Sequence, residues 1–600
     1  MFQSFDAPTS PEQGPPRIAA LRKLLATRGI DGFIVPRADV HQGEYVADHD
    51  ARLAWLTGFT GSAGFAIILP EIAGVFIDGR YRVQVKAQVA LDSFTPVPWP
   101  ETKPGDWIRT NLSRGRVAYD PWLHSRDEID RITTALAGSE VTLEPTDNLV
   151  DAIWSDQPAP PLGRIDVQPE ALAGETSAEK RARLAAALKE AGQKAAILTL
   201  ADSISWLLNI RGHDIPRNPV VHALAILRDD GQLRLFVDDR KLDADLRKHL
   251  GPEISVEPPD AFAAALDSLE GPVRVDRASA PKAVSDRLAA AGVEIVWAPD
   301  PCILPKARKN PAEIAGTAEA HLRDGAAMCA FLAWLDAEAP KGTLTEIAVV
   351  SALEGFRRAT NALRDISFDT ICGAGPNGAI VHYRVTEGTD RPVKTGELLL
   401  VDSGGQYVDG TTDITRTVAV GQVGEPEKLA FTRVLQGMVA ISRARWPRGL
   451  AGRDLDTLAR MPLWLAGQDY DHGTGHGVGA FLCVHEGPQR ISRISEVPLE
   501  PGMILSNEPG YYREGAFGIR TENLLAVVEA PPIPDGDDRA MLSFRTLTWV
   551  PIDRRLILRD MLSPEERFWI DAYHAEVLER IGERVSPETL DWLRRATAPL

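Results

Sequence analysis

The first half of the chain repeats one order of apolar and polar positions. Each copy opens with an amphipathic helical pattern, continues with a short apolar strand and a tryptophan-centred segment, and then reaches strands that end in aspartate. These features lie at 18–28, 32–36, 52–59 and 74–80 in the first copy, and at 178–191, 195–200, 203–212 and 233–240 in the second. Strands that alternate with helices favour an α/β domain, so we expect a diverged repeat of two such domains.

Proline-rich segments divide the chain into three parts. The first segment, Gln157–Pro161, is typical of a linker. The second extends from Pro299 to Pro311, and the alanine-rich stretch 312–336 that follows predicts a long amphipathic helix because it contains no proline. The domains that we expect are 1–157, 158–307 and 308–600.

In the last third of the chain, four acidic residues and one histidine lie in short stretches rich in Gly, Thr or Pro at the edges of apolar runs. They are Asp402, Asp413, His476, Glu508 and Glu522. Burial of such carboxylates costs free energy unless they are paired or bind metal. Four carboxylates carry a charge of about −4, which two divalent cations balance, so the set predicts a two-metal site. Oxygen ligands with a single nitrogen suit Mn²⁺, Fe²⁺, Co²⁺ or Zn²⁺ and argue against a thiolate site.

Composition and charge exclude several other classes of protein. The chain has 600 residues, of which 44% are hydrophobic and 25% charged, as is ordinary for globular proteins. Its net charge of −18 disfavours nucleic acid and anionic membranes as partners. No apolar run reaches the roughly 18 residues that span a bilayer, and Met1–Pro16 lacks the pattern of a secretory signal. The four cysteines form no CxxC pair, so we expect a reducing, cytoplasmic location.

Four motifs in the last third match a known family in order and spacing. They lie at 401–416, 472–479, 508–512 and 515–523. With these motifs the sequence resembles the pita-bread metallopeptidases, most closely the long, three-domain form of aminopeptidase P, and the resemblance covers nearly the whole chain. It implies a fold class of α/β and α+β, with two similar N-terminal α/β domains followed by a C-terminal pita-bread catalytic domain.

The resemblance implies a role for each ligand of the predicted two-metal site. Asp402 binds one metal, His476 and Glu508 bind the other, and Asp413 and Glu522 bridge both. Mn²⁺ is the cation that we expect first. In the family's mechanism a hydroxide bridging the metals attacks the peptide carbonyl, and Glu508 takes the proton from the attacking water.

Further residues near these motifs are expected to act on the substrate. The resemblance assigns His382 and His485 to hydrogen bonding of the substrate carbonyl and the tetrahedral intermediate, so both are expected to be catalytic together with Glu508. His472 is expected in the wall that holds the proline. Tyr512 and Arg520 are expected beside the substrate, where Arg520 orients an acidic ligand through charge-assisted hydrogen bonds.

The implied activity is metal-dependent hydrolysis of the N-terminal Xaa-Pro bond, which releases the first residue of peptides with proline in second position. The family's long form also implies a homodimer. Two alternatives stay open. Prolidase cleaves Xaa-Pro dipeptides with the same metal ligands, but it usually has one N-terminal domain rather than two. A non-catalytic pita-bread module that binds peptides lacks the metal ligands that are present here.

The glycine-rich run Gly473–Gly479 invites comparison with nucleotide-binding loops. It lacks a GxGxxG register that leads into a helix and a ribose-binding acid, so we set that interpretation aside. We expect its glycines to let the backbone pass close to the metals.

Overall fold

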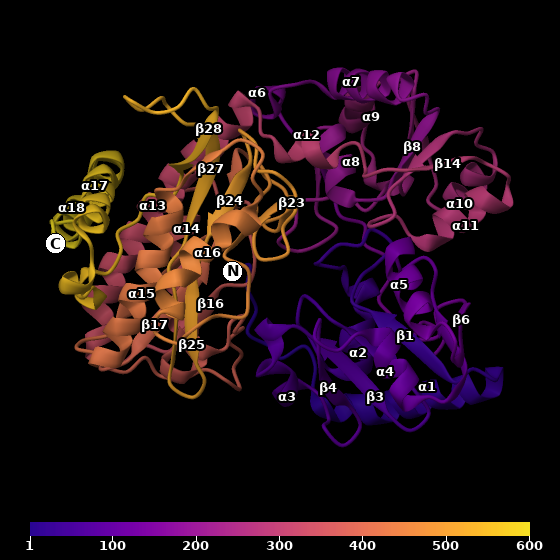
Figure 1. Cartoon of the computed structure of the whole chain (residues 1–600), viewed down its shortest axis with the longest axis horizontal. Coiled ribbons are helices and arrows are strands. Elements are labelled where there is room, and N and C mark those ends of the chain that lie inside the picture. Colours follow the sequence, from indigo (N-terminus) through magenta and orange to yellow (C-terminus); the bar gives the residue numbers. More distant parts are fainter. The chain divides into compact units, whose positions relative to one another are not determined.

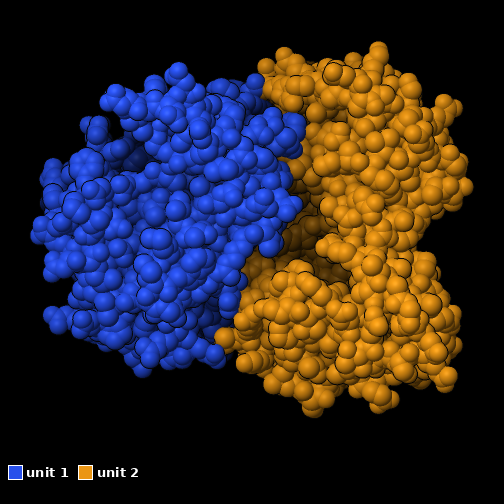
Figure 2. All heavy atoms as spheres, viewed as in Figure 1, with its two compact units in different colours: residues 1–7, 171–174, 304–600 blue, residues 8–170, 175–303 orange.

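The polypeptide, a computed structural model that describes residues 1–600, divides into two compact units (Figures 1 and 2). The C-terminal unit consists of residues 1–7, 171–174 and 304–600, and the N-terminal unit consists of residues 8–170 and 175–303. The first residues of the chain belong to the C-terminal unit because Gln3 and Thr370 exchange two hydrogen bonds, of 2.8 and 3.3 Å.

The first lobe of the N-terminal unit is built on a six-stranded mixed sheet whose strands lie between residues 32 and 145 (Figure 1). The strand order is β4-β3-β2-β1-β5-β6, in which β2 pairs antiparallel with both neighbours and all other pairs are parallel. The strands are β1 (Gly32–Pro36), β2 (Phe65–Ile68), β3 (Ala73–Ile77), β4 (Thr95–Pro98), β5 (Arg114–Tyr119) and β6 (Glu140–Pro145). The helices are α1 (Gly14–Arg28), α2 (Arg52–Thr57), α3 (Gln84–Gln88), α4 (Pro104–Asn111) and α5 (Arg126–Leu136).

Residues 175–303, the second lobe, repeat this sheet. Its strand order is β12-β11-β10-β8-β13-β14, and β10 is again the strand that pairs antiparallel with both neighbours. The strands are β8 (Ala195–Leu198), β10 (Leu224–Arg228), β11 (Leu233–Phe236), β12 (Ile254–Glu257), β13 (Val273–Val275) and β14 (Ile295–Trp297). The helices are α7 (Ser177–Glu190), α8 (Ala201–Leu207), α9 (Ala244–Leu250), α10 (Ala261–Asp267) and α11 (Lys282–Ala290). The same strand order and directions in both lobes confirm the predicted internal repeat.

The strands that were expected to end in aspartate end slightly earlier. β3 stops at Ile77 and β11 at Phe236. In each lobe an aspartate, Asp78 or Asp238, caps a 3₁₀ turn that begins at the next residue. Its side chain accepts a hydrogen bond of 3.0 Å from the N–H group two residues later. Both copies of the repeat therefore leave the sheet through the same capped turn.

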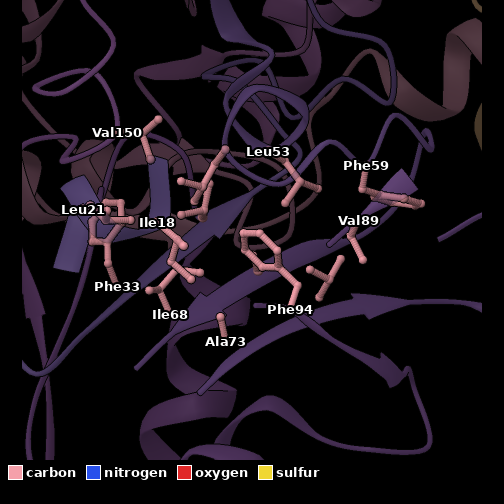
Figure 3. Close-up of a cluster of buried hydrophobic side chains, with 14 of the residues drawn as sticks. Ile18, Leu21, Phe33, Leu53, Phe59, Ile68, Ala73, Val89, Phe94 and Val150 are labelled. Carbon is pink, nitrogen blue, oxygen red and sulfur yellow. The ribbon is translucent and has the colours of Figure 1, made fainter. Parts of the chain in front are cut away.

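Helix α1 covers one face of the first-lobe sheet with a stripe of buried side chains (Figure 3). Ile18, Leu21 and Leu25 recur at the spacing of a helical face and are at most 3% exposed. They belong to one cluster with strand residues such as Phe33 and Ile68. Burial of each large apolar side chain contributes roughly 1.5–3 kcal/mol, which anchors the helix on the sheet.

The C-terminal unit has an α+β arrangement with two main antiparallel sheets. The smaller sheet has the order β16-β17-β20 and the larger one the order β21-β28-β27-β24-β22-β23. Their strands are β16 (Ile371–Ala374), β17 (Leu398–Ser403), β20 (Ile414–Ala419), β21 (Arg445–Pro447), β22 (Gly475–Gly477), β23 (Glu486–Ile491), β24 (Ile504–Asn507), β27 (Asn523–Glu529) and β28 (Met541–Thr546). A short hairpin of β25 (Gly510–Arg513) and β26 (Phe517–Arg520) lies between β24 and β27 in the chain.

The helices of this unit are α13 (Pro311–Glu338), α14 (Glu346–Arg358), α15 (Glu425–Ser442), α16 (Gly452–Trp464), α17 (Pro564–Ile581) and α18 (Pro587–Ala596). Helix α13 confirms the helix predicted at 312–336. It begins at Pro311 because the Asn310 side chain accepts hydrogen bonds of 3.0 Å from the N–H groups of Ala312 and Glu313. None of the helices combines the length and the apolar character needed to cross a bilayer.

Candidate metal centre

Two of the predicted ligands come from the smaller sheet of the C-terminal unit. Asp402 is the penultimate residue of β17 and lies opposite Thr415 of β20. Asp413 directly precedes β20. Because β17 and β20 are neighbouring antiparallel strands, both carboxylates lie at the same end of this strand pair.

The other three predicted ligands come from the larger sheet. His476 is the central residue of β22, Glu508 follows the last residue of β24, and Glu522 precedes the first residue of β27. The partner of Asn507 in the ladder is Asn523, so Glu508 and Glu522 leave paired strands at the same end. The two sheets meet here, because the N–H of Glu522 donates a hydrogen bond of 3.1 Å to the carbonyl oxygen of Thr415.

The side chains of these residues converge. The Nε2 atom of His476 lies 3.5 Å from Oδ2 of Asp413 and 3.3 Å from Oε1 of Glu508. Asp413, His476 and Glu522 each offer a ligand atom, and these atoms lie within 4.8 Å of one another. Oxygen and nitrogen ligands at about 2.0–2.2 Å from one cation have separations of roughly 3 Å, so the cluster has the dimensions of a metal site.

The charges of the cluster also suit a cation site. Burial raises the pKa of Asp413 well above its usual range, and the charges of Asp402 and Glu508 raise it further. Burial likewise raises the pKa of Glu522, with additional contributions from Asp413, Glu508 and Asp402. The buried Oδ1 atom of Asp402 has no hydrogen-bond partner. Buried, mutually repelling carboxylates with an unpaired oxygen fit two divalent cations.

Hydrogen bonds aim the ligands into the cluster. Nδ1 of His476 lies 2.9 Å from the carbonyl oxygen of Gly477, which fixes the ring with Nε2 toward the acids. The hydroxyl of Ser506 donates to Oε1 of Glu508 at 3.0 Å and accepts from the N–H of His476 at 2.9 Å. The hydroxyl of Thr415 donates to Oε2 of Glu522 at 2.8 Å. Sequence reasoning missed Ser506 and Thr415, although each lies two positions from a predicted ligand.

Arg520 is the buried cation of the site. Its Nη2 lies 2.5 Å from Oδ2 of Asp402, its Nε lies 3.9 Å from Oε2 of Glu508, and its Nη1 donates to the hydroxyl of Tyr512 at 2.6 Å. Burial disfavours the charged guanidinium, but Tyr512, Asp402 and Glu508 outweigh it and raise the pKa of Arg520. The structure thus places Arg520 against two ligand carboxylates, as expected for a residue that orients them.

His472 and Tyr512 continue from Arg520 as a hydrogen-bonded chain. Nε2 of His472 lies 2.8 Å from the hydroxyl of Tyr512, and its Nδ1 lies 2.7 Å from the carbonyl oxygen of Gly473. Burial raises the pKa of Tyr512 to about 12, so the phenol stays protonated at neutral pH. These two side chains form a polar wall that begins at the cluster.

The remaining predicted histidines lie on loops beside the cluster. The ring of His485 packs edge-on against the ring of His476, with centroids 4.3 Å apart and an interplanar angle of 80°. His382 is half-buried in a turn, and the carbonyl oxygen of its neighbour Val381 lies 3.5 Å from Nη1 of Arg520. Cys483 is half-buried and takes part in no disulfide.

Glu486, the residue after His485, lies in a buried charge cluster with Lys306 and Lys309 that the sequence did not reveal. The carboxylate of Glu486 lies 3.0 Å from Nζ of Lys306 and also accepts a hydrogen bond from Nζ of Lys309. Both lysines are at most 6% exposed. They belong to the proline-flanked basic stretch before α13, whose composition alone suggested only a connection between domains.

Two glycines of the run 473–479 lie against neighbouring strands. A Cβ atom on Gly475 would lie 1.9 Å from the carbonyl oxygen of Ser506, and one on Gly477 would lie 2.2 Å from that of Glu486. These glycines therefore let β22 approach its neighbours β24 and β23, and the expectation that the run lets the backbone pass close to metals stays a prediction.

Family models match four parts of the chain. Two models of the creatinase/prolidase N-terminal domain match residues 17–153 and 156–313, metallopeptidase family M24 matches residues 315–529, and the C-terminal region of this peptidase family matches residues 540–600. The chain is 38% identical to a probable Xaa-Pro aminopeptidase P of Laccaria bicolor, over 97% of this chain and 93% of the relative. It is 39% identical to aminopeptidase P2 of Arabidopsis thaliana, over 97% of this chain and 88% of the relative.

The chain belongs to the aminopeptidase P family of M24 metallopeptidases. Among solved structures it is similar to an X-prolyl aminopeptidase of Caenorhabditis elegans, which is described as a cytosolic enzyme with a di-nuclear active site. That match has 32% identity and a TM-score of 0.93, and it covers 98% of this chain and 100% of the other. A Xaa-Pro dipeptidase of Bacillus anthracis, 24% identical with a TM-score of 0.51, shares the fold over 63% of this chain and 99% of its own. The predicted aminopeptidase P family and fold class are confirmed.

Proposed function

We propose that this chain is a metal-dependent Xaa-Pro aminopeptidase that releases the first residue of peptides with proline in second position. The observation that carries the proposal is the convergence of four carboxylates and one imidazole at the meeting point of two sheets. The names of the relatives that match almost the whole chain give the substrate class.

In this proposal the ligands divide between two divalent cations. Asp402 binds one cation, His476 and Glu508 bind the other, and Asp413 and Glu522 contact both. Mn²⁺ is the first candidate, and Co²⁺, Fe²⁺ and Zn²⁺ suit the same oxygen-rich set. When bound, such cations lower the pKa of a water molecule and polarise the scissile carbonyl.

The protein's own side chains supply proton transfer and orientation. Glu508 accepts the proton of the attacking water, and the hydrogen bond from Ser506 to its Oε1 keeps its carboxylate in place. His485 and His382 donate hydrogen bonds to the oxygen that gains negative charge during attack. His485 is supported in this task by its contact with His476 and by the buried neighbour Glu486.

Recognition of proline requires an apolar surface for the ring rather than a hydrogen bond, since the imide nitrogen has no N–H. We assign His472 and Tyr512 to the wall against which the substrate lies, because their mutual hydrogen bond and the packing of their rings hold both side chains beside the ligand cluster. At the end of this wall beside the ligand carboxylates, Arg520 holds Tyr512 in place by a hydrogen bond to its hydroxyl.

The further assignments follow from family membership. We propose domains at 1–157, 158–307 and 308–600, a homodimeric assembly and a cytosolic location like that of the Caenorhabditis elegans enzyme. The partners are peptides with proline in second position, without nucleic acid or membrane.

The test compares two peptides. Metal-stripped protein is incubated with Arg-Pro-Pro or with Arg-Pro, with and without added Mn²⁺, and free Arg is measured by chromatography. We expect metal-dependent release of Arg from the tripeptide and weak cleavage of the dipeptide. Preferred cleavage of the dipeptide would instead indicate a prolidase, and no cleavage of either peptide by the metal-loaded protein would indicate a binding module.

A further inference from the structure

A second group of metal-ligating side chains lies in the N-terminal unit. Asp39, Asp50 and His222 each offer a ligand atom, and these atoms lie within 4.8 Å of one another. Asp39 and Asp50 belong to the first lobe, whereas His222 belongs to the second lobe and precedes β10 by two positions. The group therefore joins the two copies of the internal repeat.

The buried carboxylate of Asp39 is only half satisfied. Its Oδ1 atom accepts hydrogen bonds from the N–H groups of His41 and Gly43, at 2.9 and 3.4 Å. Its Oδ2 atom has no hydrogen-bond partner, although Asp39 is 1% exposed. This oxygen faces Nε2 of His222 at 3.4 Å, and that nitrogen also lacks a hydrogen bond. Two buried polar atoms that face each other without a hydrogen bond are costly unless a third group lies between them.

An ordinary ion pair does not account for the arrangement. The Asp39 carboxylate and the His222 ring approach each other only to 3.4 Å, and neither of the two facing atoms has a hydrogen bond. A neutral imidazole with an available ring nitrogen is the form that binds metals. Asp50 adds the second carboxylate, and Arg52 holds its Oδ1 at 2.9 Å.

The spacing matches that of the metal centre in the C-terminal unit. There, Nε2 of His476 lies 3.3 and 3.5 Å from its two carboxylate oxygens, and here the corresponding distance is 3.4 Å. Two ligands that bind one Zn²⁺ at about 2.0–2.1 Å with a tetrahedral angle lie about 3.3 Å apart. The imidazole–carboxylate separation is thus similar in the two clusters of this protein.

We propose that Asp39, Asp50 and His222 bind one divalent transition-metal cation, with Zn²⁺ as the expected ion, which links the two lobes of the N-terminal unit. Three protein ligands, one nitrogen and two oxygens, leave a fourth position for water, and Zn²⁺ accepts such a set. His41 supports the site, because its Nδ1 lies 3.0 Å from the carbonyl oxygen of Thr199 while its ring packs against His222 with centroids 4.5 Å apart.

The experiment measures Zn²⁺ bound to the full-length chain in which the catalytic cluster is disabled by Asp413→Asn and Glu522→Gln. Metal-stripped protein is dialysed against a series of Zn²⁺ concentrations, and bound zinc is quantified by mass spectrometry. We expect one tightly bound Zn²⁺ per chain in this background. Adding His222→Gln should weaken Zn²⁺ binding at least about 100-fold. The control is His213→Gln, which replaces a histidine that pairs with Asp166 near the surface, and it should leave Zn²⁺ binding unchanged.

Absence of bound zinc in the background protein would overturn the proposal, as would unchanged affinity after His222→Gln. X-ray absorption at the zinc edge of the background protein provides a test that needs no variant at the new site. It should detect a low-coordinate shell with one imidazole, and an all-oxygen shell would contradict the assignment. Because Asp413 and Glu522 are replaced in both measurements and neither uses a substrate, these results are independent of the outcome of the peptide assay.

Discussion

The guanidinium of Arg520 contacts the carboxylate of Asp402 at 2.5 Å while its Nε lies within 3.9 Å of Glu508. One buried arginine thus touches carboxylates that come from different sheets. Such a group holds the cluster together before any cation binds and keeps each carboxylate turned toward the site.

We therefore expect Arg520→Lys to lower activity by about 10–100-fold, because an ammonium group cannot reach Asp402, Tyr512 and Glu508 together. The measurement is the rate of Arg release from Arg-Pro-Pro at saturating Mn²⁺. Arg513→Lys, at an exposed position of β25, is the matched control and should keep full activity. Equal activity of both variants would exclude the orienting role of Arg520.

Thr415→Val should weaken metal binding by about 10-fold or more, because it removes the hydroxyl that donates to Glu522. Thr417→Val serves as the control on the same strand, since the Thr417 hydroxyl bonds only to backbone groups of Arg520. Each variant loses two buried hydrogen bonds of about 1 kcal/mol each, so both should be destabilised to a similar degree. Only Thr415→Val should need more Mn²⁺ for half-maximal activity, and a parallel shift in Thr417→Val would argue against this interpretation.

Glu522→Gln should abolish most of the activity, by more than about 100-fold, and remove stoichiometric metal while the fold is kept. The reason is that Glu522 is proposed to contact both cations. Metal content by mass spectrometry and the circular dichroism spectrum together check the expectation. Retention of both metals with normal turnover would end the two-metal assignment.

The stability of the metal-free protein should depend on pH in a defined direction. Burial and neighbouring acids raise the folded-state pKa values of Asp413 and Glu522. The stability associated with these groups is fully present below their unfolded pKa values and is lost as pH rises through the folded ones. Urea denaturation of stripped protein should therefore give a lower free energy of unfolding at about pH 8 than at about pH 5. Glu522→Gln should reduce this difference, and Glu425→Gln, at an exposed position of α15, should leave it unchanged.

A similar argument applies to Asp300 in the N-terminal unit. Burial raises its pKa to about 6, and its Oδ2 atom has no hydrogen-bond partner. The stability that this group contributes is lost as pH rises from its unfolded pKa through about 6. Asp300→Asn should therefore gain stability relative to the wild type between about pH 5 and pH 7.5, by about 1–1.5 kcal/mol. The comparison is made by urea denaturation, with Asp230→Asn at an exposed site as the control. A constant difference between variant and wild type across this range would contradict the expectation.

The five candidate ligands were predictable because each is a carboxylate or imidazole within a short motif that matches a known family in order and spacing. The roles of Ser506 and Thr415 were not predictable. A serine or threonine in a strand can bond to a ligand carboxylate or to a backbone group, and the sequence does not distinguish the two. Only the strand register shows that Thr415 lies opposite Asp402. The burial of Lys306 was not predictable for a related reason, because it depends on the partner Glu486, which lies 180 positions further along the chain.

The repeat of the first half was also predictable, because both copies keep the order of helix, strand and tryptophan segment. The contact between Asp39 and His222 was not, because it depends on how the two lobes of the N-terminal unit pack. The order of apolar and polar residues does not predict which side chains of the two lobes lie close together.

The hydrogen bond between Glu522 and Thr415 joins the two sheets of the C-terminal unit at the candidate metal centre. In the chain, the five candidate ligands extend from Asp402 to Glu522. During synthesis on the ribosome, the pocket is therefore incomplete until residue 522 has emerged from the exit tunnel. Loading with metal has to follow translation of nearly the entire catalytic region, so a nascent chain arrested before that point holds the early ligands without the means to close around a cation pair.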